Sequence, residues 1–142
     1  MAVGALIDTG VVLALLDRSD RWHGACVEAY ENTDLPLLTT EAVLAEVFHL
    51  TYRNLREVTG VWRLLRSGAV RMSSITPDEL PGIEALMNEY ADHPMDFADA
   101  TLVHLAARES LSLILTVDHD DFETYRIGGK KRFTILPGRK RK

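Results

Sequence analysis

Apolar residues along the chain form two alternating kinds of segment, which are short continuous runs and longer stretches with helical spacing. The continuous runs are rich in leucine and β-branched residues and predict strands at 3–7, 37–40, 69–75, 111–118 and 132–136. The longer stretches carry apolar residues at helical spacing and predict helices at 11–16, 22–32, 41–53, 56–67, 77–90 and 96–107. Strands that alternate with helices are typical of an α/β fold with a mainly parallel central sheet, here of four or five strands.

Capping residues mark where two of these helices begin. In "TPDEL", Thr76 is the expected N-cap, Pro77 takes the first helical position and Glu79 completes a capping box. In "PMDFADATLVHLAA", Asp96 is the expected N-cap, and Asp99 lies in the first turn, where a carboxylate also stabilises a helix start. Asp99 shares the apolar face of this helix, however, and capping does not explain an acid on that face.

Length and composition indicate one ordinary globular domain. The chain has 142 residues, of which 46% are hydrophobic and 26% charged. Its single cysteine, Cys26, excludes an internal disulfide and the zinc sites built from several cysteines. No targeting segment and no apolar run of membrane-spanning length is visible, so we expect a cytoplasmic protein without membrane contact. We interpret 1–137 as a single globular domain and 138–142 as a basic tail.

Charge is divided unevenly along the chain. Residues 1–127 hold all 21 acidic residues and 9 of the 16 basic ones, a net charge of −12, whereas the last fifteen residues carry +7. An acidic body repels nucleic acid unless cations and a basic segment intervene. The basic end is therefore either a solvated tail or a segment that contacts phosphates.

Four acidic residues stand at positions where their charge needs a partner. Asp8 and Asp118 follow predicted strands, and ligands of parallel sheets bind outside the carboxyl ends of the strands. Glu46 and Asp99 each share a helical stripe with apolar residues, where an unpaired carboxylate is rarely buried. Divalent cations offset the repulsion between such groups, and oxygen ligands suit Mg²⁺ or Mn²⁺.

The motifs around these acids resemble those of PIN-domain ribonucleases. "LIDTGVVLALL", "TTEAVLAEVFHL", "MDFADATLVHLA" and "ILTVDHDDF" occur in the order of that family, and in size and motif order the chain is similar to VapC-type toxins of toxin–antitoxin pairs. Each motif alone is weak, but together they cover nearly the whole chain. The resemblance implies a three-layer α/β/α fold of PIN type.

The resemblance also implies a function and a set of residues that perform it. It implies an endoribonuclease that hydrolyses RNA, with a small antitoxin as partner and a homodimer as the assembly. One or two Mg²⁺ or Mn²⁺ ions would be held by Asp8, Glu46, Asp99 and Asp118, with Thr9 or Thr116 as polar neighbours. A "YR" pair after "DDF" resembles one branch of the family. We expect RNA contacts from basic residues near the C-terminus, namely Arg126, Lys130, Lys131 and Arg132.

Several alternatives stay open at this point. Asp96 could replace Asp99 as a ligand, or act beside it as a cap or a neighbour of the metal. A phosphatase of the haloacid dehalogenase type is disfavoured because Gly10 stands where a second aspartate is needed and every lysine lies in the C-terminal segment. A non-catalytic PIN-type module that binds RNA or a protein partner is the remaining alternative.

Overall fold

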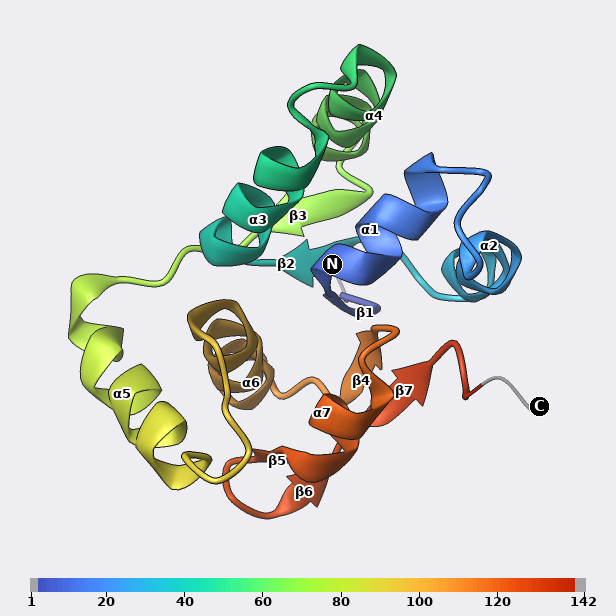
Figure 1. Ribbon diagram of the computed structural model, residues 1–142. Helices are drawn as coiled ribbons and strands as arrows, with labels where there is room; N and C mark the ends of the chain where they lie inside the picture. The colour runs from blue at the N-terminus through green and yellow to red at the C-terminus, as the bar shows by residue number, and fades with distance from the viewer. Residues whose placement is uncertain (1–2, 140–142) are drawn as a thin grey trace.

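The computed structural model describes residues 3–139 and is built around a parallel sheet with the strand order β3-β2-β1-β4-β7 (Figure 1). The strands are β1 (Ala5–Ile7), β2 (Leu37–Thr39), β3 (Val70–Met72), β4 (Leu113–Leu115) and β7 (Thr134–Leu136). All four pairings in this sheet are parallel. The prediction of an α/β fold with a parallel central sheet is confirmed, although each strand is shorter than its apolar run. A separate antiparallel hairpin consists of β5 (Arg126–Ile127) and β6 (Lys131–Arg132).

Helices cover both faces of the sheet. Figure 1 shows the helices that precede β3 on one side of the sheet and those that follow it on the other, which gives the expected three layers. The first group comprises α1 (Thr9–Leu16), α2 (His23–Glu31), α3 (Glu41–Thr51) and α4 (Leu55–Arg66). The second group comprises α5 (Leu80–Glu89), α6 (Phe97–Glu109) and the short α7 (His119–Thr124). None of the helices within residues 3–139 is long and apolar enough to cross a membrane.

The central strand β1 explains why the strands read as continuous apolar runs. Its three residues are fully buried because β1 has neighbours on both edges and helices on both faces. Leu6 lies opposite Leu38 of β2 and Ile114 of β4, so apolar side chains meet across these three strands. Cys26 is also fully buried, as its apolar surroundings in the sequence predict.

Both predicted helix starts are confirmed by their hydrogen bonds. Thr76 and Glu79 form the capping box, although the first turn, Pro77–Glu79, is a 3₁₀ helix that leads into α5. The side chain of Asp96 accepts a hydrogen bond from the N–H of Asp99 at 2.7 Å and caps α6. These caps fix the positions of α5 and α6 on one face of the sheet.

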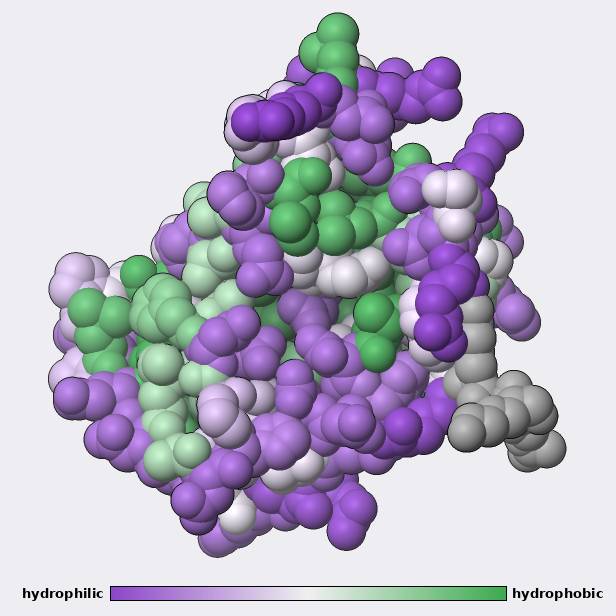
Figure 2. Space-filling model, viewed as in Figure 1, coloured by the Kyte–Doolittle hydropathy of each residue, from purple (hydrophilic) through white to green (hydrophobic). Residues whose placement is uncertain are grey.

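Apolar and polar side chains are segregated on the surface. Figure 2 shows apolar side chains between α1 and α4 and along α5, whereas polar side chains surround the middle of this face. At the turn between α3 and α4, Leu50, Tyr52 and Leu55 are 57%, 61% and 79% exposed. Apolar groups exposed together in this way are typical of surfaces that contact partners.

Candidate active site

Asp8 lies at the carboxyl end of β1, where it also begins α1. Its carboxylate accepts a hydrogen bond from the N–H of Thr9 at 2.8 Å, and only 6% of the residue is exposed. Ile7 lies opposite Leu115 in the parallel register, so Asp8 stands next to Thr116. The Thr116 hydroxyl donates to the other carboxylate oxygen at 3.0 Å. The strands that precede Asp8 and Asp118 are therefore neighbours in the sheet.

Asp118 lies farther from its strand than the sequence suggests. The predicted strand was 111–118, but β4 ends at Leu115, and Asp118 is exposed. Its N–H donates to the Thr116 hydroxyl at 3.0 Å. One threonine thus connects the carboxylate of Asp8 with the backbone of Asp118.

Asp99 approaches the same edge from α6. It is 8% exposed, and its carboxylate accepts a hydrogen bond from the Tyr125 hydroxyl at 3.1 Å. A contact between the hydroxyls of Thr40 and Thr101, 2.8 Å apart, joins the start of α3 to α6. Asp96, the capping residue, is exposed. The two aspartates therefore differ as the helical pattern predicts, with Asp99 inward and Asp96 outward.

The orientation predicted for Glu46 is wrong. Glu46 is exposed, and Leu50 on the same stripe is 57% exposed. The buried face of α3 instead contains Val43, Leu44, Val47 and Thr51. Glu46 nevertheless lies close enough for its charge to raise the pKa of both Asp8 and Asp118.

The electrostatics show that these carboxylates interact with one another. Burial raises the pKa of Asp8 to about 7, against hydrogen bonds from Thr9 and Thr116, and the charges of Asp118 and Glu46 add to the rise. Burial, followed by the charges of Asp8 and Asp96, raises the pKa of Asp99 to about 8.

The pKa of Asp118 is raised as well, first by burial and then by neighbouring acids. Within residues 3–139, none of the ion pairs includes Asp8, Glu46, Asp99 or Asp118. Their mutual repulsion is therefore not offset by a basic side chain that pairs with them.

The chemistry of this cluster fits a hard divalent cation. The side-chain atoms with which these acids could bind an ion are all oxygens. Within residues 3–139, the buried hydroxyl oxygen of Thr9 has no hydrogen-bond partner. In the described part of the chain, however, no three carboxylate, imidazole or thiol groups stand in a geometry that would hold an ion. The acids are thus within electrostatic reach of one another, and a cation would have to draw them together.

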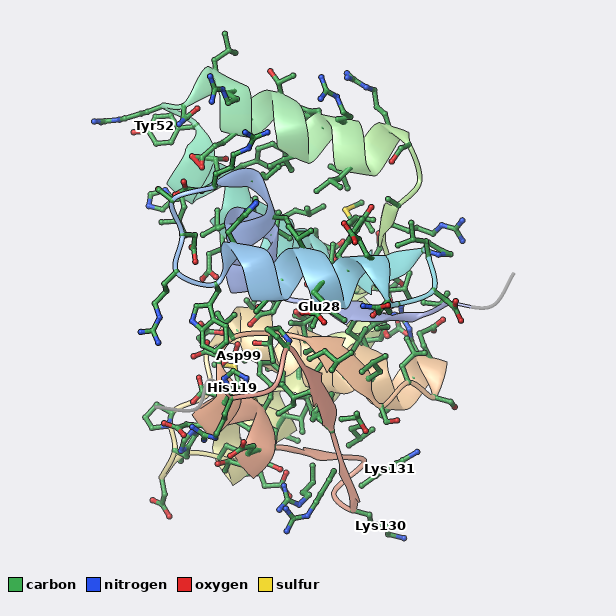
Figure 3. The ribbon with its side chains drawn as sticks, turned by 90° about the vertical axis from the view of Figure 1, so that its right-hand side faces the viewer. Glu28, Tyr52, Asp99, His119, Lys130 and Lys131 are labelled. Atoms are coloured by element: carbon green, nitrogen blue, oxygen red, sulfur yellow. The ribbon has the colours of Figure 1, made fainter. Side chains whose placement is uncertain are left out.

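The basic residues predicted to contact RNA form no ion pair with these acids within residues 3–139. Arg126 is half-buried, and its guanidinium donates to the carbonyl oxygens of residues 123, 124 and 125. Lys130, Lys131 and Arg132 are exposed on the β5–β6 hairpin. Figure 3 shows Lys130 and Lys131 at the tip of this hairpin, well apart from Asp99.

In the predicted tail, Arg139 pairs with Asp120 and Glu123, while 140–142 lie outside the described residues. Tyr125 contacts Asp99, and the sequence pattern does not predict this contact. The only signal for it was the "YR" pair.

Comparisons with known proteins agree with this fold. The sequence profile of the PIN domain matches residues 5–128. Ribonuclease VapC26 of Mycobacterium tuberculosis is 31% identical over 134 residues, which cover 93% of this chain and 99% of that protein.

Two solved structures have the same fold. The toxin VapC20 of M. tuberculosis, described as cleaving the sarcin–ricin loop, superimposes with a TM-score of 0.73 at 20% identity, over 82% of this chain and 91% of that one. A toxin–antitoxin complex from Klebsiella pneumoniae gives a TM-score of 0.67 at 22% identity, over 84% and 91% of the two chains. The profile match and the identity to VapC26 show that the chain belongs to the PIN-domain family.

Proposed function

We propose that this protein is an endoribonuclease that hydrolyses RNA with a divalent metal, and that it is the toxin of a toxin–antitoxin pair. The observation that carries the proposal is the pair of buried, mutually repelling carboxylates of Asp8 and Asp99, without a paired basic side chain among residues 3–139. The relative that shares 31% of its residues over nearly its whole length is named a ribonuclease of the VapC type.

Asp8, Asp99 and Asp118 would hold one or two Mg²⁺ or Mn²⁺ ions, with Glu46 at the exposed side of the site. When bound, such an ion lowers the pKa of a water molecule and stabilises negative charge on the reacting phosphate. The chain's own residues prepare this site. Thr116 orients Asp8 and the segment of Asp118 through its two hydrogen bonds.

Other chemistry of the chain does not compete with this proposal. Cys26 is fully buried in the core and cannot reach an RNA substrate as a nucleophile. The Thr9 hydroxyl is buried beside Asp8 without a partner, which suits an additional oxygen contact to an ion or to its water. Hydrolysis by a metal-activated water requires no side-chain nucleophile.

An apolar groove supports the proposal of a protein partner. The groove has a volume of about 680 Å³ and lies between the start of α5 and the start of α6, where Leu80 and Phe97 are 45% and 47% exposed. Its further lining includes Pro77, Pro81, Ile83 and Met87. An antitoxin segment and a second copy of the chain are both candidates for this surface. The assignment of a homodimer stays a prediction.

A non-catalytic PIN-type module that binds RNA or a protein is the second candidate. Two observations favour the non-catalytic module. Glu46 is exposed, and no group of three potential ligands among the described residues stands ready to hold an ion. The two candidates differ in one consequence. Only the nuclease needs the charges of Asp8 and Asp99 for its activity.

The test is cleavage of a mixed RNA preparation by the purified chain, with Mg²⁺ or with EDTA. We expect cleavage only with metal, and a loss of about 100-fold or more in Asp8→Asn and Asp99→Asn, since replacing even outer contacts of metal sites reduces activity 10- to 100-fold. Asp34→Asn is the matched control. Asp34 is exposed, and its backbone contacts Gly4, which directly precedes β1. It therefore lies at the amino end of β1, whereas the proposed site lies at the carboxyl end. Cleavage that survives both site variants would exclude the proposed site.

A further inference from the structure

We propose that Tyr125 is a positioning residue for the metal site, because its hydroxyl holds the carboxylate of Asp99 in one orientation. The inference rests on the proposed function, in which Asp99 is a ligand. It assigns to Tyr125 an effect on metal affinity that is separate from any effect on folding.

The contact between the two side chains is direct and buried. Tyr125 is fully buried, and its hydroxyl lies 3.1 Å from Oδ2 of Asp99. Within residues 3–139, this is the one side-chain hydrogen bond that the Asp99 carboxylate accepts. The terminal torsion of an aspartate is otherwise broad, so a donor fixed at one oxygen settles how the other oxygen is presented.

The ring of Tyr125 is held by three neighbours. The rings of Tyr90, Phe122 and His93 lie 5.0, 5.3 and 5.9 Å away, at interplanar angles of 70°, 84° and 85°. Edge-to-face contacts of this kind are a preferred aromatic geometry. The neighbours come from the end of α5, from α7 and from the connection to α6. The position of the hydroxyl is thus set by packing that does not depend on Asp99.

The backbone at Tyr125 is fixed as well. Its N–H donates to the carbonyl of Asp121 at 3.0 Å, and its carbonyl accepts from the Arg126 guanidinium at 3.0 Å. The N–H of Arg126 also donates to the Tyr90 hydroxyl at 2.8 Å, but the three bonds from the Arg126 guanidinium to the carbonyls of residues 123, 124 and 125 do not involve Tyr90. Arg126 therefore closes the end of α7 and holds Tyr125 in place, which gives the "YR" pair a physical role.

A phenol suits this position better than a basic side chain. A phenol has an ordinary pKa of about 10, so the Tyr125 hydroxyl is protonated at neutral pH and donates to Asp99. A neutral donor orients the carboxylate without cancelling its charge. An arginine or lysine would form an ion pair with Asp99 and compete with a cation.

Tyr90 provides a matched control for the hydroxyl. It belongs to the same aromatic cluster and its hydroxyl also makes one hydrogen bond, but that bond is to the backbone of Arg126. Tyr90→Phe and Tyr125→Phe therefore each remove one hydrogen bond of a hydroxyl and keep a ring. Only Tyr125→Phe removes a contact to Asp99.

The experiment is a calorimetric titration of the full chain with Mn²⁺ alone, combined with thermal melting in EDTA. We expect Tyr125→Phe to weaken Mn²⁺ binding about 10-fold, in the range seen when the partners of ligating groups are removed, and Tyr90→Phe to stay within about twofold of the wild type. Both variants should melt at similarly lowered temperatures. Equal Mn²⁺ affinities of Tyr125→Phe and the wild type would overturn the inference.

A second measurement leaves Tyr125 unchanged. The chain has four tyrosines, and the triple variant Y30F/Y52F/Y90F keeps Tyr125 as the one that remains. We expect Mn²⁺ to produce a tyrosine difference spectrum in this variant, because ion binding alters the carboxylate to which the phenol donates. A flat tyrosine difference spectrum despite Mn²⁺ binding would contradict the inference and leave the proposed function intact. No Mn²⁺ binding by the wild type would overturn both.

Discussion

Replacing Asp8 by asparagine should stabilise the metal-free protein at neutral pH. Burial of Asp8 beside other acids raises its pKa from 3.8 to about 7, so the folded protein keeps a proton that the unfolded chain has released. The contribution of Asp8 to the free energy of unfolding is therefore fully present below pH 3.8 and is lost as the pH rises to about 7. Asparagine carries no such charge, and its amide oxygen can still accept the hydrogen bond from the N–H of Thr9.

The magnitude follows from the pKa difference. Each pH unit between the unfolded and the folded pKa changes the free energy of unfolding by about 1.4 kcal/mol. Between pH 5 and pH 7, the wild type should lose roughly 2 kcal/mol relative to Asp8→Asn, and the difference should level off above about pH 7. The pKa of Asp99 and that of Asp118 are raised too, so wild-type stability falls in the same direction through all three groups.

The assay is urea unfolding in EDTA at pH 5, 6, 7 and 8, with the wild type, Asp8→Asn and the exposed control Asp34→Asn. Added Mn²⁺ should stabilise the wild type by mass action and should stabilise Asp8→Asn less. A stability difference between Asp8→Asn and the wild type that does not vary with pH would refute the reasoning. So would an Asp8→Asn protein that is less stable than the wild type at pH 8.

Two further predictions concern Glu46, whose predicted orientation is wrong, and the basic hairpin, whose contact with RNA stays a prediction. Because Glu46 is exposed, Glu46→Gln should reduce Mg²⁺-dependent cleavage less than Asp99→Asn does; an equal loss would mean that a bound ion draws Glu46 fully into the site. If Lys130, Lys131 and Arg132 contact RNA, changing all three to glutamine should flatten the dependence of log affinity on log salt by about 2 for single-stranded RNA, as measured by fluorescence anisotropy. An unaltered slope would assign the hairpin no part in RNA binding.

Much of the fold follows from local patterns. The apolar runs correctly placed the strands of the parallel sheet because buried parallel strands contain few polar residues. The capping residues Thr76 and Asp96 correctly marked where helical structure begins, since caps act through bonds to nearby backbone. Asp8 could also be placed, because it follows a strand that lies in the middle of the sheet.

Features that depend on tertiary packing could not be predicted in this way. In α3, the spacing allows a buried face at residues 42, 46 and 50 or at 43, 47 and 51, and contacts with α1 and α6 select the second. The hydrogen bond from Tyr125 to Asp99 joins side chains 26 positions apart in the sequence, which no local rule relates. From the sequence, Arg126 is expected to contact phosphates. In the structure its guanidinium donates to the carbonyl oxygens at the end of α7, which the sequence does not predict.

The central claim is that Asp8 and Asp99 share a divalent metal. A crystal of the full chain soaked in Mn²⁺ tests it most directly, because anomalous scattering locates the ion and identifies the carboxylates around it. We predict a peak with carboxylate oxygens of both Asp8 and Asp99 at about 2.0–2.2 Å, the range for hard cations of this size. A peak bound by Asp96 instead of Asp99, or a crystal with no ion beside Asp8 at saturating Mn²⁺, would contradict the account.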